Sequence, residues 1–135
     1  MWQIVQQEIS RAINDHFIIN EKTRVSGGDI NQNFHVSDGN RHFFVKVNDK
    51  ALTAMFDEEQ FSLGHIESSR SIQVPKVICN GVTASQCFLV LEYLPLRTAN
   101  PSDWQILGES LASMHKATDN KMFGWDNDNY IGKTL

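Results

Sequence analysis

Apolar residues recur at two different spacings along the chain, and the changes of spacing predict the order of its elements. Residues 2–17 carry apolar side chains at steps of three and four, which predicts a helix, and residues 52–66 return to this spacing. From about residue 22, two β-rich runs predict a hairpin. Two more strands are predicted in VPKVICNG and FLVLEYL, and a third helix in NPSDWQILGESLASMHKAT.

Turn and cap residues refine this order. Pro75 is expected at the start of its strand, where no ladder hydrogen bond is lost, and residues 81–86 are expected to form the next turn. Ser102 and Gln105 have the spacing of a capping box at the third helix. Strands grouped around one helix predict an α+β fold, a small antiparallel sheet with a helix on one side.

Asp38 and Gly39 predict the geometry of the hairpin, because a type I′ turn needs positive φ at both central positions. Directly opposed residues share a face of the sheet. One face of the hairpin is therefore apolar, and the other combines an aromatic ring, a cation and two amides, which is not the composition of a plain core face. Counting outward from the turn pairs Ser37 with Asn40, Phe34 with Phe43, Asn33 with Phe44, and Asn31 with Lys46.

Composition and charge narrow the class of protein. The 135 residues are 41% hydrophobic and 21% charged, which suits one globular domain. The net charge of −4 and the lack of a Lys/Arg block argue against a nucleic-acid partner. No run approaches the ~18 apolar residues of a membrane span, and the first residues do not resemble a signal peptide, so we expect a cytoplasmic protein. Cys79 and Cys87 have neither disulfide-framework nor metal-site spacing.

Lys46 lies in the middle of the strand FFVKV and has two interpretations. A solvated edge-strand charge is the simpler one. The next helix favours the other, because Glu59 falls near the middle of its apolar stripe and would be costly to bury without a partner. An ion pair between Lys46 and Glu59 satisfies both groups. Since buried pairs are seldom retained for stability alone, a ligand is the expected third member.

Gly27 and Gly28 lie in SGGDINQNF, between the first two strands. This pair fits a plain hairpin turn, but it also permits a close backbone approach to an anion. The order of glycine loop, strand lysine and helix glutamate matches the phosphate-handling lobe of protein-kinase-like enzymes. FLVLEYLPL then falls at the hinge of such a lobe, although a buried strand explains it equally well.

The sequence resembles the fructosamine (ketosamine) kinase family, which has a protein-kinase-like fold related to aminoglycoside phosphotransferases. The resemblance covers about residues 22–132. It is carried by GGDINQNF, FFVKVN, MFDEEQFSL, VPKV, FLVLEYL, LGESLASMHK and, most specifically, FGWDNDNYIG. The implied activity is ATP-dependent phosphorylation of a sugar hydroxyl on a ketosamine, such as a fructosamine or ribulosamine, leading to protein deglycation.

The resemblance also implies an ATP site, in which the glycine loop and the lysine contact phosphates, the hinge backbone contacts adenine, and Phe44 packs on the adenine ring. Asp128 and Asn129 are assigned to the substrate side, with turn-forming side chains as the alternative. His115 is interpreted as structural, because the helix dipole favours histidine near a C-terminus. The expected ATP-binding residues are Gly27, Gly28, Asp29, Asn31, Phe44, Lys46, Glu59, Glu92, Tyr93 and Leu94.

The same resemblance divides the chain into a nucleotide-binding N-lobe (residues 1–95) and the start of a C-lobe (residues 96–135). Phosphoryl transfer also needs a catalytic carboxylate and Mg²⁺ ligands, which the family carries on a His-Gly-Asp loop and a later aspartate. None of the five histidines here precedes Gly-Asp, so the catalytic aspartate is expected downstream of Leu135. We therefore expect this chain to supply the ATP-binding half, to contain no catalytic or metal-binding residue, and to be inactive alone.

Two other functions remain open. One is a different small-molecule phosphotransferase of the aminoglycoside type, against which FGWDNDNYIG argues. The other is a non-catalytic, pseudokinase-like fragment, which the missing catalytic loop favours. Expected partners are ATP and a glycated amine or protein. The helix at 102–117 is expected to fold back, to self-associate or to stay exposed, because the family's second lobe would cover its apolar residues Trp104, Leu107, Leu111 and Met114.

Overall fold

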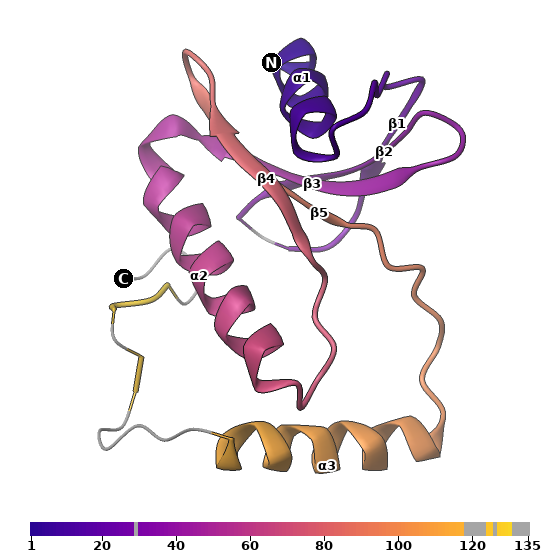
Figure 1. Cartoon of the computed structure of the whole chain (residues 1–135), viewed down its shortest axis with the longest axis vertical. Helices are drawn as coiled ribbons and strands as arrows, with labels where there is room; N and C mark the ends of the chain where they lie inside the picture. Colours follow the sequence, from indigo (N-terminus) through magenta and orange to yellow (C-terminus); the bar gives the residue numbers. More distant parts are fainter. Residues whose placement is uncertain (29, 118–123, 126, 131–135) are drawn as a thin grey trace.

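The computed structural model describes residues 1–28, 30–117, 124–125 and 127–130. Within them, runs of strands are separated by helices along the chain (Figure 1). They are α1 (Trp2–Ala12), β1 (Glu21–Val25), β2 (Gln32–Ser37), β3 (His42–Asp49), the short 3-10 helix η1 (Lys50–Leu52), α2 (Thr53–Ser69), β4 (Val77–Val82), β5 (Gln86–Glu92) and α3 (Pro101–Lys116).

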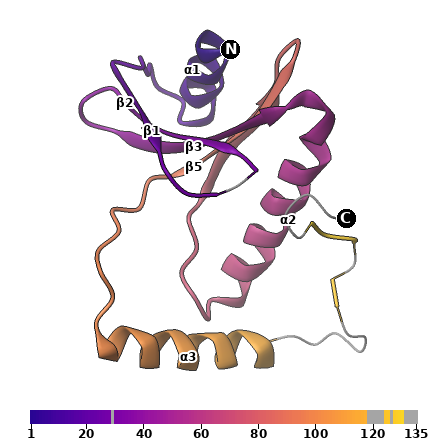
Figure 2. The ribbon, with the colours of Figure 1, turned by 180° about the vertical axis from the view of Figure 1, so that it is seen from behind.

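The five strands form one antiparallel sheet in the order β1-β2-β3-β5-β4. The sequence predicted a helix on one side, whereas two helices cover opposite faces, α1 on one and α2 on the other (Figures 1 and 2). Alternation along β3 explains this, because Phe43, Val45 and Val47 are buried with α1 while Phe44 packs with the α2 cluster. The predicted α+β class and antiparallel sheet are confirmed.

The first helix is shorter than its apolar spacing predicts, since it ends at Ala12 rather than near residue 17. Asn14 has a left-handed φ of 52°, which turns the chain out of the helix. Phe17 is nevertheless fully buried and meets Phe43 edge to face, with ring centroids 5.0 Å apart. Its place in the apolar pattern therefore reflects burial in the same core and not a continued helix.

The predicted hairpin register is wrong by two residues. Asn33 pairs with Lys46, where the type I′ turn would have placed Asn31. The loop covers residues 38–41 because the Asp38 carboxylate accepts the backbone N–H of Asn40 (2.9 Å) and of Arg41 (2.7 Å). Among the described residues only glycines, Asn14 and Arg70 have positive φ, so Asp38 does not form the first half of a type I′ turn. An even shift keeps each side chain on its predicted face.

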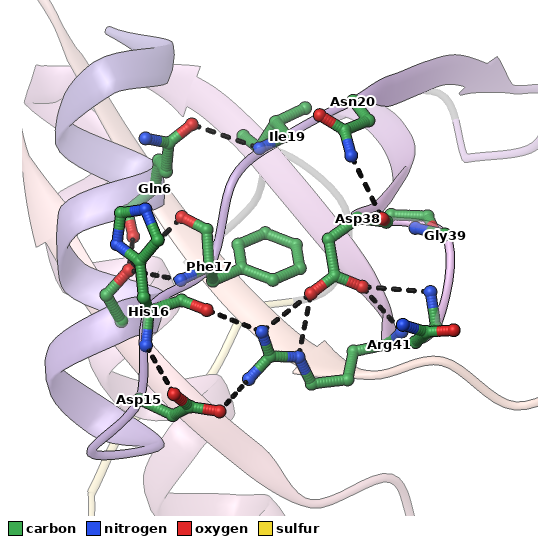
Figure 3. A network of polar contacts seen from close by, with 12 residues as sticks. Gln6, Asp15, His16, Phe17, Ile19, Asn20, Asp38, Gly39 and Arg41 are labelled. Carbon is green, nitrogen blue, oxygen red and sulfur yellow. Dashed lines mark hydrogen bonds and ion pairs between the residues drawn. The ribbon is translucent and has the colours of Figure 1, made fainter.

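Arg41 fastens this loop to the connection between α1 and β1 (Figure 3). Its guanidinium donates to the Asp38 carboxylate at 2.8 Å and to Asp15 Oδ2 at 2.9 Å, and it also donates to the carbonyl of His16. The backbone N–H groups of Arg41 and Asn40, together with the guanidinium, lower the pKa of Asp38 to about 2. The N-terminal helix is therefore tied to the strand pair that carries Lys46.

The β4–β5 turn is tighter than predicted, because β4 continues to Val82 and β5 begins at Gln86. Thr83 closes it by donating its backbone N–H to the Gln86 carbonyl at 2.7 Å. The Thr83 hydroxyl also donates to that carbonyl and accepts the backbone N–H of Gln86. Gly81, expected in the turn, lies inside β4 opposite the buried Phe88. Pro75 precedes β4 by two residues instead of starting it.

The last described helix, α3, is capped by different residues from those predicted. Asn100 accepts the N–H groups of Ser102 and Asp103, and the Asp103 carboxylate accepts the N–H of Asn100, which completes a capping box that begins two residues before the one predicted at Ser102 and Gln105. Figure 2 shows α3 standing apart from the sheet, and no residue of it is buried. None of the described helices has both the length and the apolar character needed to cross a bilayer.

Candidate functional site

The predicted ion pair between Lys46 and Glu59 is formed. The lysine Nζ lies 2.5 Å from Glu59 Oε2, across the gap between β3 and α2. The two side chains are 18% and 29% exposed, so the pair is partly shielded but reachable from solvent. Lys46 has three N–H donors, and among the described residues only Glu59 accepts one of them through its side chain. The ammonium therefore has donors left for an anion.

Helix α2 places Glu59 because its first turn is anchored in the core. Met55 and Phe56 are buried against Leu89 and Leu91 of β5. Glu59 lies one turn further on the same stripe, and the Phe56 ring lies 6.0 Å from the lysine nitrogen. A carboxylate on such an apolar stripe is costly to desolvate without a partner. The sequence pattern therefore dictates the pairing that the structure shows.

The glycine loop between β1 and β2 adopts backbone angles that favour glycine, with φ of 116° at Gly27 and 86° at Gly28. A Cβ at Gly28 would lie 3.2 Å from the side-chain nitrogen of Asn33, which donates to the Gly27 carbonyl at 2.6 Å. Asn33 thus holds the loop closely over the sheet. Since Asn33 is also the strand partner of Lys46, the loop and the lysine strand are joined through one residue.

Asn33 was missing from the predicted site, and the misplaced register is the reason. Its Oδ1 is buried and has no hydrogen-bond partner among the described residues. A buried acceptor without a donor costs about 1–3 kcal/mol, so this position favours an O–H or N–H donor, from water or from a ligand. Asn31, predicted in its place, instead accepts from the Asn48 amide at 2.7 Å and is held against β3. Asp29 lies outside the described residues.

The predicted hinge follows the end of β5. The backbone N–H of Glu92 already donates to the Lys76 carbonyl at 2.8 Å, so it is not available to a base, and the hinge donors begin beyond it. Tyr93 stacks on His35, with ring centroids 4.1 Å apart. Phe44 lies in β3 between β5 and β2, and its strand partners are Leu91 on one side and His35 on the other. His35 was also missed, for the same reason as Asn33.

The described part of the FGWDNDNYIG motif contacts α2. Asn129 accepts the N–H of the next residue, Tyr130, at 2.7 Å and donates to the Ser62 hydroxyl at 3.3 Å. Asp128 is exposed. Their assignment to a substrate side stays a prediction.

The expected position of the catalytic aspartate is not tested by this structure. That aspartate is expected downstream of Leu135, and Leu135 itself lies outside the described residues. The expectation that the chain carries no catalytic residue therefore stays a prediction.

A hollow of about 860 Å³ lies elsewhere, between residues 57–68 of α2 and residues 75–77. Asp57, Gly64 and Ser68 are among the residues that line it, and neither Lys46 nor the glycine loop does. None of its lining residues forms, with another described residue, an ion pair of the kind that Lys46 forms with Glu59. The chemistry of the described residues therefore points to the Lys46–Glu59 pair and not to this hollow.

Comparison with known proteins identifies the family. The sequence model of the fructosamine kinase family matches residues 1–135. A probable ketoamine kinase of Synechocystis sp. is 39% identical over 133 residues, covering 98% of this chain and 45% of that protein. A probable ketoamine kinase of Vibrio parahaemolyticus is 38% identical, covering 100% of this chain and 47% of that protein. The chain thus spans about half the length of these relatives.

Solved structures agree with this result. A crystal structure from Haemophilus somnus, whose name contains fructosamine-3-kinase, matches with a TM-score of 0.92 and 27% identity, over 98% of this chain and 45% of that one. A thermostable aminoglycoside phosphotransferase mutant matches with a TM-score of 0.54 and 14% identity, over 83% of this chain and 38% of that one, which is a likeness of fold alone. On the family match over its whole length, the chain belongs to the fructosamine kinase family.

Proposed function

We propose that this chain is the nucleotide-binding half of an ATP-dependent ketosamine kinase. The observation that carries the proposal is the Lys46–Glu59 pair, a partly buried cation held by a carboxylate beside a glycine loop. Protein-kinase-like enzymes use this arrangement to hold the phosphates of ATP. Family membership supports a kinase, and the relatives' names supply the ketosamine as the acceptor class.

Each part of the site has a role in this proposal. Bound ATP would supply the phosphoryl group that is transferred. Lys46 would hold its phosphates from one side, and the loop at Gly27 and Gly28 would cover them with backbone N–H groups. Tyr93 and Leu94 would offer backbone groups to the base, next to Phe44. The other residues proposed for the site are Asp29, Asn31, Glu92, Asp128 and Asn129. Because the backbone N–H of Glu92 donates to the Lys76 carbonyl, this N–H would not bind the base.

We assign no Mg²⁺ ligand to the described residues. No group of three or more His, Cys, Asp or Glu side chains in those parts of the chain could hold an ion. In the proposal, residues 1–95 form the N-lobe and 96–135 begin the second lobe, whose metal ligands and catalytic aspartate would follow Leu135. The chain alone is then expected to bind nucleotide without transferring phosphate to a ketosamine.

Calorimetric titration with ATP and with adenosine tests the nucleotide site. Lys46→Ala is expected to weaken ATP binding by about tenfold or more, because it removes charged hydrogen bonds to phosphate, and to leave adenosine binding unchanged. Lys50→Ala, which removes an exposed lysine of η1, is the matched control and should match wild type for both ligands. Equal effects of the two variants, or a wild type that binds neither ligand, would refute the proposal.

A further inference from the structure

The described residues 124–125 and 127–130 contact α2 directly at two places and pack at a third on the core cluster that α2 shares with β5. Trp125 meets His65 edge to face, with ring centroids 5.8 Å apart and planes at 80°. Asn129 donates to the Ser62 hydroxyl at 3.3 Å. Tyr130 packs against the cluster that contains Met55. These contacts involve the most specific motif of the sequence, for which the nucleotide site has no direct use.

Tyr130 packs on the cluster to which Met55 belongs, and the other two contacts follow Glu59 along the helix. Met55 precedes Glu59 by one turn, Ser62 follows it by nearly one turn, and His65 lies nearly one turn further. His65 in turn packs on Phe61, with ring centroids 4.3 Å apart. The described residues of this segment therefore lie beside the part of α2 that contains Glu59.

Helix α2 gains from such support because its fully buried residues lie near one end, and further along Leu63 packs on the same cluster while only partly buried. Its buried residues are Met55 and Phe56, both near its start, although the helix continues to Ser69. The remaining turns carry half-buried or exposed side chains. Regions with few buried apolar contacts open at a low free-energy cost, and a small rotation at Glu59 would separate its carboxylate from Lys46.

We propose that Trp125, Asn129 and Tyr130 are positioning residues that hold α2 at the rotation in which Glu59 reaches Lys46. The proposal concerns the segment's effect on the phosphate-binding lysine, and it rests on the nucleotide site proposed above. Contact between the segment and the helix links the region after α3 to the phosphates of the nucleotide. It does so without any direct contact between these three side chains and ATP.

The first test uses the ligand-free chain and measures hydrogen exchange at the amides of residues 57–66. Trp125→Ala combined with Tyr130→Ala is expected to raise the exchange rates roughly threefold to tenfold, the loss expected for removed aromatic contacts. Trp104→Ala is the matched control, because this indole is 65% exposed on α3, and it should leave the rates unchanged. Trp125→Phe keeps an aromatic edge for His65 and should restore most of the protection.

The second test compares ATP with adenosine by calorimetry in the same variants. Loss of the contacts should weaken ATP binding several-fold and leave adenosine binding unchanged, because Lys46 acts on phosphate. A merely structural role would weaken both ligands equally, which would overturn the proposal. Unchanged ATP affinity in a chain with raised exchange would also overturn it.

The two tests separate this proposal from the proposed function. A wild-type chain that binds neither ligand would refute the nucleotide site, and hydrogen exchange would then decide on the support of α2 alone. Unchanged exchange in the double variant would overturn that support whether or not nucleotide binds. Raised exchange there, with the Trp104→Ala control unchanged, would sustain it.

Discussion

At the scale of single residues, Asp38 sets the position of the strand that carries Lys46. Its carboxylate accepts two backbone N–H groups and the Arg41 side chain. These donors stabilise a four-residue loop over a two-residue type I′ turn, and the register follows from the loop. Asn33 rather than Asn31 consequently faces Lys46. One carboxylate therefore decides which amide completes the candidate site.

The hydrogen bonds to Asp38 predict a stability contribution that depends on pH. Its pKa is about 2 in the folded chain, against a usual 3.8. A lowered pKa stabilises the folded state above pH 4, and this contribution is lost as the pH falls from about 4 to 2. The difference in unfolding free energy between wild type and Asp38→Asn, measured with urea, should shrink over that range. An Asp38 carboxyl that titrates near pH 4 by NMR would contradict it.

At the scale of elements, the two helices stabilise the sheet in different ways. Helix α1 covers a continuous core with Val5 and Ile9, whereas α2 is buried only at its first turn. The strand pair β4–β5 supports both, because Phe88 faces the α1 side and Leu89 the α2 side. Close packing of this pair requires Gly81, since a Cβ there would lie 2.6 Å from the Phe88 ring.

Two alanine substitutions should therefore have opposite effects. Gly81→Ala is expected to destabilise the fold by about 1–3 kcal/mol, the usual result of overpacking a filled core. Gly64→Ala is the matched control, because nothing lies within 4 Å of the added carbon on α2, and it should be neutral or stabilise by up to about 1 kcal/mol. Thermal unfolding followed by circular dichroism measures both. Equal melting temperatures would show that the Phe88 ring moves aside freely.

At the scale of the whole molecule, the chain consists of a packed lobe and a helix apart from it. All buried residues lie between Val5 and Leu91 in the described parts of the chain. Helix α3 has several exposed apolar side chains, among them Trp104, Leu107 and Leu111. It does not fold back onto the sheet, so of the three outcomes expected from sequence, self-association and exposure remain.

We expect α3 to cause reversible self-association of this chain, since exposed apolar faces of this kind associate in water. Sedimentation velocity over a range of concentrations should show a mass that rises with concentration. Leu107→Glu with Leu111→Glu should lower the association, and Ser113→Glu, on the opposite side of the helix, is the control. A wild type that is monomeric at all concentrations would contradict this expectation.

The sequence predicts the central pair of the site better than its surroundings. Helix and strand periods alone place Glu59 on the stripe facing Lys46, because both periods are fixed by backbone geometry. The roles of Asn33 and His35 depended on register, and register depended on how one aspartate side chain bonds its own loop. The end of α1 likewise depended on Asn14, whose left-handed conformation leaves no trace in apolar spacing. Strand register and helix ends are therefore decided by local polar contacts and backbone conformation, which the spacing of apolar residues does not reveal.

The alternation along β3 has a consequence for how such a protein diverges. Positions 43, 45 and 47 are buried with α1, whereas Phe44 packs with the α2 cluster and Lys46 reaches Glu59. Core packing and the charge of the ion pair are thus carried by different residues of one strand. Selection can therefore act on the charge at position 46 separately from the packing at 43, 45 and 47.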